Sequence, residues 1–170
     1  WEKGVDKILE SLEYIEHKNV ELLIVGSFMT DEKSDFYSKQ LQRLSMNNGS
    51  KIHYTGYIEH EYLPHLYNLA DIAVLPSMWE EPAGLTMLEA MACGTPVITT
   101  FSGGIPEYVG DAAIVLKRNE KLPLEIAKNI DILLSDTEKY NLYSKKGIER
   151  IKCMFSSENY IDNFCSIVCD

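Results

Sequence analysis

The feature that most constrains the fold of this sequence is a series of short apolar segments separated by helical patterns. These segments lie at residues 20–25, 51–55, 71–75, 96–100 and 112–116. Most are nearly continuous rather than alternating, which is typical of strands covered on both faces in a parallel sheet. Because helical patterns lie between them, the order predicts right-handed βαβ units and a doubly wound α/β sheet.

Three of the intervening segments place apolar residues at helical spacing. The residues expected on their buried faces are Ile8, Leu9, Leu12 and Ile15; Tyr62, Leu66 and Leu69; and Leu85, Leu88 and Ala92. Met87 and Met91 are expected to fill the core rather than to contact a ligand. A polar loop is expected at 30–35 and a turn at 48–50.

The last third of the sequence differs in character, with no further strand expected after Leu116. Apolar residues at helical spacing predict helices around 126–133, 137–152 and 157–168. The expected organisation is a single domain over 1–170, with a sheet part at 1–116 and C-terminal helices at 117–170.

The composition excludes several classes of function. The 170 residues carry a formal net charge of −10, which argues against nucleic acid as a partner because phosphate backbones need a basic face. A nucleotide is still allowed, since one lysine and a helix N-terminus can hold a diphosphate. There is no apolar run of membrane-span length and no signal-peptide pattern. The chain opens on Trp1 rather than Met, so we expect a fragment of a longer protein.

The cysteines favour a reducing location. Cys93, Cys153, Cys165 and Cys169 are not spaced as metal ligands, and Cys93 falls in a helix expected to be buried. We therefore expect no disulfides and a cytoplasmic protein.

Ligands of open α/β sheets bind outside the carboxyl ends of the strands, beside helix N-termini. Glycines follow several expected strands here, at Gly26, at Gly56 and at Gly103-Gly104. A longer loop, "PSMWEEPAGL" at 76–85, follows another strand and leads into a helix expected to begin near Gly84. These strand ends are the place where a ligand pocket is expected.

The loop at 76–85 offers an anion site and two carboxylates. The free backbone N–H groups of a helix that starts near Gly84 are those of about Gly84 to Met87, and the helix dipole favours an anion beside them. Glu89 lies about one and a half turns into this helix, where it can accept two hydrogen bonds from a vicinal diol such as ribose. Glu81 lies in the loop before the helix, where it can accept hydrogen bonds from a sugar.

Structural interpretations compete with each of these. A glutamate near a helix N-terminus is favourable without any ligand. His53, His60 and His65 lack ligand spacing on one helix face, which favours structural roles. The sequence contains no Walker loop, no G-x-G-x-x-G, no Asp-x-Asp and no G-x-S-x-G. A P-loop kinase, a dinucleotide dehydrogenase, an Asp-x-Asp metal-dependent transferase and a serine hydrolase therefore lose support.

The stretch "EPAGLTMLEAMACGTPVI" resembles the motif of retaining glycosyltransferases of family 4, which have the GT-B fold. Its two acids, Glu81 and Glu89, have the family's E-x7-E spacing. "EKGVDKILE", "LLIVG", "YTGYI", "LYNLADIAVLPS" and "SGGIPEYVGD" are similar to further family segments in the same order. The resemblance covers about residues 2–116 well and the helical tail loosely.

The resemblance implies a fold and a set of site residues. It implies the C-terminal, Rossmann-like domain of a GT-B enzyme, which binds the nucleotide-sugar donor, while an N-terminal acceptor domain lies outside this chain. The positions that match donor-binding residues of the family are Lys3 (diphosphate), Ile58 (base), Gly84, Leu85 and Thr86 (backbone facing the phosphates), Glu89 (ribose) and Glu81 (donor sugar). Lys3 and Glu81 are the implied catalytic residues. Ala83 departs from the family, which often has Phe there, and the family's arginine upstream of the lysine is absent.

The implied reaction moves a sugar from a UDP-, GDP- or ADP-sugar to a hydroxyl of a saccharide or lipid-linked acceptor, with retention and without a metal or other cofactor. Polysaccharide or glycolipid biosynthesis in the cytoplasm, with peripheral association at the inner membrane face, is the implied setting. The isolated chain is expected to be inactive. Two alternatives remain: another GT-B nucleotide-sugar enzyme, such as an epimerase, and a non-catalytic nucleotide-binding α/β module.

Overall fold

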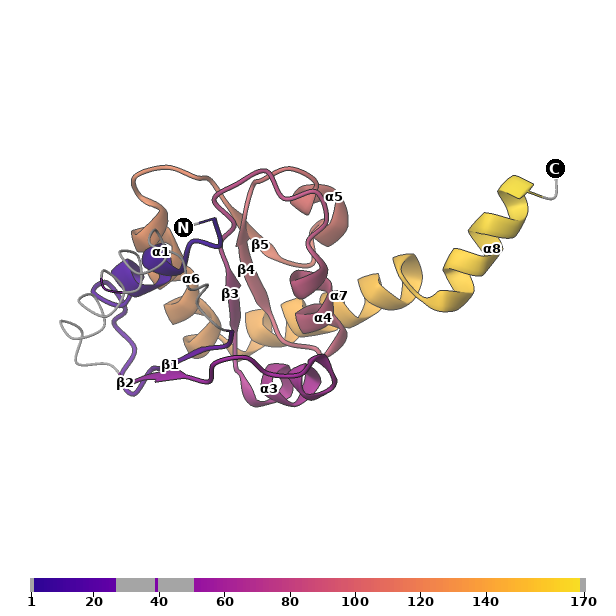
Figure 1. Ribbon diagram of the computed structural model, residues 1–170. Helices are drawn as coiled ribbons and strands as arrows, with labels where there is room; N and C mark the ends of the chain where they lie inside the picture. The colour runs from indigo at the N-terminus through magenta and orange to yellow at the C-terminus, as the bar shows by residue number, and fades with distance from the viewer. Residues whose placement is uncertain (1, 27–38, 40–50, 169–170) are drawn as a thin grey trace.

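A computed structural model describes residues 2–26, 39 and 51–168 of the chain (Figure 1). Its strands are β1 (Glu21–Ile24), β2 (Lys51–Tyr54), β3 (Ala73–Leu75), β4 (Val97–Thr100) and β5 (Ile114–Leu116). Each falls within an expected apolar segment, and every pair of neighbouring strands is parallel. The polar loop expected at 30–35 and the turn expected at 48–50 lie outside the described residues.

The strands form two hydrogen-bonded groups rather than one continuous ladder. β1 pairs with β2, and β4 lies between β3 and β5. Figure 1 shows the β1–β2 pair running in a different direction from the three-stranded sheet. An isolated bridge between Gly26 and Gly56 prolongs the contact of β1 and β2 at their carboxyl ends.

Helices cover both faces of the three-stranded sheet, which confirms the predicted α/β class. The helical elements are α1 (Val5–Ser11), η1 (His60–Tyr62), α3 (Leu63–Leu69), α4 (Leu85–Ala92), α5 (Ile105–Val109), α6 (Leu122–Ser135), α7 (Thr137–Met154) and α8 (Ser157–Val168). Successive residues of β4 serve opposite faces: Val97 packs with α4 and α5, whereas Ile98 packs with α6. This alternation is the period of two expected of a strand buried on both sides.

The buried face of α4 differs from the one predicted. Leu85 is 62% exposed, whereas Met87 and Met91 are buried, as expected for core residues, together with Ala90. The packing of α7 against α4 explains which face of α4 is buried. The two helices lie so close that a Cβ added at Gly147 of α7 would be 3.3 Å from the Cβ of Met91. The bare backbone at Gly147 lets the two helices approach closely on the methionine side. Leu85 is thereby left on the surface, at the carboxyl edge of the sheet.

The predicted faces of α1 and α3 were also partly wrong. Tyr62 and Leu69 are 54% and 74% exposed. The preceding residues form the short 3-10 turn η1, so the helical phase starts at Leu63 and turns Tyr67 toward the core. α1 ends at Ser11, so Leu12 and Ile15 lie beyond it, although Ile15 still packs against the α6 cluster.

The C-terminal part is helical, as predicted, and the described residues contain no strand after Leu116. α6 and α7 pack on the body, while Figure 1 shows α8 extending away from it. Within the described ranges, no helix has both the length and the apolarity needed to cross a membrane.

Candidate functional site

The loop between β3 and α4 brings a lysine, a glutamate and a tryptophan together. Lys3 Nζ lies 2.7 Å from Glu81 Oε2. Trp79 Nε1 donates a hydrogen bond to the same oxygen at 2.9 Å. The ammonium of Lys3 also lies 5.5 Å from the centre of the Trp79 ring, within the range of a cation–π contact. The structure therefore unites Lys3 and Glu81, which are 78 positions apart in the sequence.

Gly4 is the reason Lys3 reaches this loop. The backbone of Gly4 is left-handed, with a φ of 63°, and a Cβ there would lie 2.1 Å from the carbonyl oxygen of Pro76. Just beside this contact, the backbone N–H of Met78 donates to the carbonyl of Glu2 at 2.7 Å. Only glycine permits both the conformation and the close approach.

The backbone of Glu81 is held by the loop that follows β4. The N–H of Gly104 donates to the carbonyl of Glu81 at 2.9 Å. Gly103 has a φ of 49°, and a Cβ there would lie 2.4 Å from the same carbonyl oxygen. Ser102 completes the contact, because its hydroxyl donates to the carbonyl of Trp79. Gly103 and Gly104 therefore let the loops that follow β3 and β4 pack closely against one another.

The surroundings of Glu81 keep its carboxyl ionised. Glu81 is only 9% exposed, and this burial alone would raise its pKa. Hydrogen bonds from Lys3 and Trp79, with the Ser77 hydroxyl nearby, outweigh the burial and hold the pKa below its usual value. Glu81 is accordingly a carboxylate at neutral pH, which can accept but not donate hydrogen bonds.

The neighbouring Glu80 ties three strand-end loops together. One of its carboxylate oxygens pairs with the guanidinium of Arg118, after β5, and the other accepts from the N–H of Gly103 at 2.6 Å. Arg118 also donates to the carbonyl of Met78 at 3.3 Å. The Arg118 hydrogen bond, with that of Gly103, holds the pKa of Glu80 below its usual value.

The N-terminus of α4 lies directly after this loop. Gly84 is the N-cap, and no side chain caps the helix. The N–H of Leu85 turns back to the carbonyl of Ala83, and that of Met87 bonds to the carbonyl of Gly84. Among the described residues, no acceptor contacts the N–H groups of Gly84 and Thr86. The set of free N–H groups is therefore narrower than the predicted run from Gly84 to Met87.

Glu89 lies one turn further along α4 and contacts two side chains. Tyr67 donates its hydroxyl to Glu89 Oε2 at 3.3 Å, and His60 Nε2 lies 3.1 Å from Glu89 Oε1. Burial, with the charge of Glu89 close by, raises the pKa of Tyr67, so its hydroxyl stays protonated and remains a donor. Ile58 is half-buried in the connection from β2 to η1, two residues before His60.

Sequence reasoning missed Trp79, Tyr67 and His60 at this site. Trp79 immediately precedes the Glu80-Glu81 pair, which was the available signal for it. Tyr67 was missed because the predicted buried face of α3 did not include it. His60 was predicted to have a structural role. His53 does have such a role, since its Nε2 lies 2.9 Å from Glu21 Oε2 across the β1–β2 pair.

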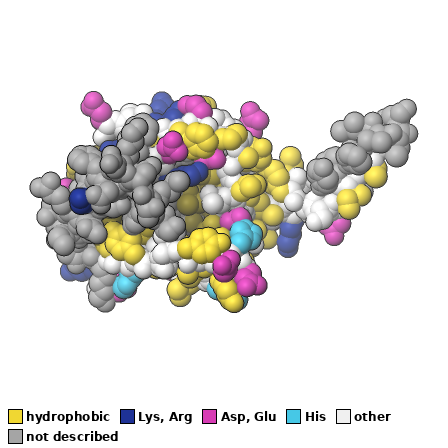
Figure 2. Space-filling view, viewed as in Figure 1, with side chains coloured by type: hydrophobic (Ala, Val, Ile, Leu, Met, Phe, Trp, Pro, Cys, Tyr) yellow, Lys and Arg dark blue, Asp and Glu magenta, His cyan; other side chains and the backbone are white. Residues whose placement is uncertain are grey.

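The surface around the site mixes apolar and charged groups. Tyr57, Leu85 and Phe101 are each more than 60% exposed. Figure 2 shows hydrophobic, acidic and histidine side chains close together on the face that it draws. Within the described ranges, no three His, Cys, Asp or Glu side chains are grouped so that they could hold a metal ion.

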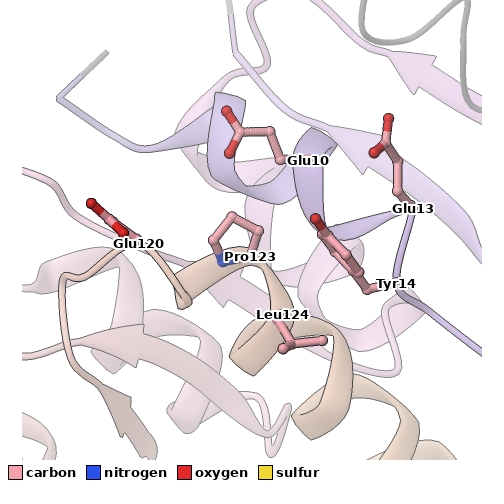
Figure 3. Close-up of a pocket in the computed structure, with 6 residues that line it drawn as sticks. All are labelled: Glu10, Glu13, Tyr14, Glu120, Pro123 and Leu124. Carbon is pink, nitrogen blue, oxygen red and sulfur yellow. The ribbon is translucent and has the colours of Figure 1, made fainter.

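A separate cavity of about 230 Å³ lies between the end of α1 and the start of α6. Figure 3 shows the residues that line it: Glu10, Glu13, Tyr14, Glu120, Pro123 and Leu124. None of these six residues makes a hydrogen bond or ion pair with Lys3, Glu81 or Glu89, so this cavity is distinct from the site.

A family model and several known proteins are similar to this chain. The family model for "Glycosyl transferases group 1" matches residues 1–150. Spore coat protein SA of Bacillus subtilis is 29% identical over 170 residues, which cover 97% of this chain and 45% of that protein. Another relative, the putative glycosyltransferase YtcC of the same species, is 31% identical over 91% of this chain and 39% of its own length. The chain thus spans less than half the length of these curated relatives.

Two solved structures share the fold. HepE of Anabaena, determined in complex with UDP and glucose, superposes with a TM-score of 0.84 at 22% identity, over 98% of this chain and 46% of that one. The C-terminal domain of LpcC, a group 1 glycosyl transferase of Francisella tularensis, gives a TM-score of 0.79 at 23% identity, over 92% of this chain and 81% of that one. With a family model matched over most of its length, the chain belongs to the glycosyl transferases group 1 family.

Proposed function

We propose that this chain is the donor-binding domain of a retaining glycosyltransferase, which transfers a sugar from a nucleoside diphosphate to an acceptor hydroxyl. The observation that carries the proposal is the ion pair of Lys3 with Glu81 at the N-terminus of α4, with Glu89 one turn along the same helix. A cation, free backbone N–H groups and two carboxylates in this order suit a diphosphate flanked by two sugars.

Each group has a role in this proposal. Lys3 and the N–H groups of Gly84 and Thr86 contact the diphosphate, with Leu85 at the same helix end. Glu89 accepts hydrogen bonds from the ribose hydroxyls, and Ile58 contacts the base through its backbone. Glu81 accepts hydrogen bonds from the donor sugar.

The chemistry follows from where charge develops. As the glycosidic bond breaks, negative charge grows on the leaving diphosphate, and groups that stabilise it more in the transition state than in the ground state accelerate the reaction. Lys3 and the α4 N–H groups can supply this stabilisation, so the proposal requires no metal.

The remaining partners belong to the whole protein. We propose that a further domain supplies the acceptor site and any catalytic base, and that the acceptor is a saccharide or a lipid-linked sugar in the cytoplasm. HepE, crystallised with UDP and glucose, supports a nucleoside diphosphate sugar as the donor.

The first test is a calorimetric titration of the chain with UDP, GDP and ADP. One nucleotide should bind with a Kd of roughly 10 μM to 1 mM, and Glu89→Ala should abolish saturable binding. Glu149→Ala is the matched control, because Glu149 pairs with Lys145 on the exposed face of α7. Binding that survives Glu89→Ala unchanged would refute the ribose role.

Turnover separates the domain proposal from the site proposal. The isolated chain should bind nucleotide but transfer no sugar, whereas a longer protein carrying the acceptor domain should do both. Transfer by the isolated chain at a comparable rate would show that no further domain is needed.

A further inference from the structure

Three different groups of Trp79 make contacts within the site. Its indole N–H donates to Glu81 Oε2, its ring face lies beneath the Lys3 ammonium, and its carbonyl accepts from the Ser102 hydroxyl. These contacts join the N-terminal segment, the β3–α4 loop and the loop after β4. Among the described residues, no other side chain makes a hydrogen bond, ion pair or cation–π contact with both Lys3 and Glu81.

A lysine and a glutamate alone would hold each other poorly here. Lys3 is exposed over 68% of its side chain, and exposed pairs with a long flexible lysine are weakly ordered because of side-chain entropy and solvent screening. The indole restricts both partners at once: the ring face limits where the ammonium can lie, and the N–H fixes the carboxylate oxygen.

We propose that Trp79 is a positioning residue of the donor site, which holds Lys3 and Glu81 in one arrangement through its ring face and its N–H. The nature of the ligand rests on the proposed function, whereas the arrangement of the three side chains does not depend on it. Trp79→Phe and Trp79→Leu separate the two contacts, since phenylalanine keeps a ring face without the N–H and leucine keeps neither.

The first test needs no ligand. The carboxyl group of Glu81 is titrated by carbon-13 NMR in the wild-type chain and in Trp79→Phe. Loss of the indole N–H removes one of the hydrogen bonds that hold the pKa of Glu81 down, so the variant should titrate at higher pH. Glu80 is the internal control, because Arg118 and Gly103 hold it and its titration should not move. An unchanged Glu81 titration in a folded variant would overturn the positioning role.

A second variant tests the ring contact without altering Trp79. In a Trp1→Phe background Trp79 is the sole tryptophan, because the sequence contains two. Lys3→Met should shift its fluorescence emission by removing the adjacent ammonium. Lys7→Met is the matched control, since Lys7 pairs with Glu10 on α1. Emission that Lys3→Met leaves unchanged would show that the ring and the ammonium are not in contact, which contradicts the proposal even if the Trp79 variants fail to fold.

Nucleotide titrations then connect positioning with binding. For whichever of UDP, GDP and ADP the wild type binds, Trp79→Leu should raise the Kd about two- to fivefold, the range of an exposed cation–π contact, while Trp79→Phe stays near the wild type. Equal affinity in all three proteins would overturn the link from Trp79 through Lys3 to the diphosphate. A wild type that binds no nucleotide would refute the proposed function, while the Glu81 titration would still decide the positioning role.

Discussion

At the scale of single residues, glycines determine how closely the loops around Glu81 approach one another. Gly4 lies against Pro76 and Gly103 lies against Glu81, and both have left-handed backbones. A β-carbon at either position would occupy space that a carbonyl oxygen already fills. The ion pair of Lys3 and Glu81 therefore depends on residues that have no side chain.

Gly103→Ala should destabilise the protein more than Gly56→Ala. Both glycines have positive φ, at 49° and 70°, so each substitution introduces backbone strain of about 1–3 kcal/mol. At Gly103 the new Cβ would also collide with the backbone of Glu81, whereas in the part of the chain that the structure describes no atom beyond the adjacent residues lies within 4 Å of a Cβ built at Gly56. Urea unfolding measures both, and equal losses of unfolding free energy would show that the loops move apart without cost.

The residues of the site differ in how far the sequence predicted them. Lys3, Glu81 and Glu89 follow from the motif spacing and the family resemblance, and the structure places Lys3 against Glu81. Trp79 has no such signal beyond adjacency, since its role arises from two contacts that exist only after the loop has folded. The diphosphate, ribose and sugar roles themselves stay predictions.

At the scale of elements, the positions of the strands along the chain were more predictable than the buried faces of the helices. Continuous apolar runs mark strands whatever their neighbours, so all the described strands fall within expected segments. The expectation that both faces are covered was wrong for β1, whose residues alternate between exposed and half-buried. α4 is apolar on more than one side, so its own pattern did not decide which side is buried. The close approach of Gly147 on α7 decided it, and this contact joins segments far apart in sequence.

The start of α7 offers an element whose stability depends on pH. Asp136 is its N-cap and accepts from the N–H of Lys139 at 3.0 Å. This hydrogen bond holds the pKa of Asp136 below its ordinary value of 3.8. A depressed pKa means that the carboxylate stabilises the folded chain above that ordinary value, and that the stabilisation is lost as the pH falls through the lower, folded value.

Asp136→Asn should weaken this dependence. Asparagine keeps the capping oxygen but does not titrate. The fall in melting temperature on acidification through the pH range just below 3.8 should be smaller in Asp136→Asn than in the wild type. Glu149→Gln, which removes an exposed carboxylate on the same helix, controls for a general loss of charge. An identical acid response in the wild type and Asp136→Asn would contradict the assignment.

At the scale of the whole molecule, α8 stands apart from the packed body. Its main contacts are with α7, and Figure 1 shows it pointing outward. Ending the chain at residue 155 should therefore change the melting temperature by no more than about 3 °C, which corresponds to roughly 1 kcal/mol for a domain of this size. Scanning calorimetry of the truncated and full chains measures the change, and a drop of roughly 10 °C or more would show that α8 supports the core.

The contacts that build the site connect positions widely separated along the chain, such as Lys3 with Glu81 and Glu80 with Arg118. Each of these contacts closes a large loop of the chain, and closing the loop costs conformational entropy before the contact can stabilise the fold. We therefore expect these contacts to form late in folding. A partly folded chain with helices and the β1–β2 pair in place would still lack the lysine–carboxylate pair. Ligand binding would then report on completion of folding, and a bound ligand would slow unfolding rather than speed folding.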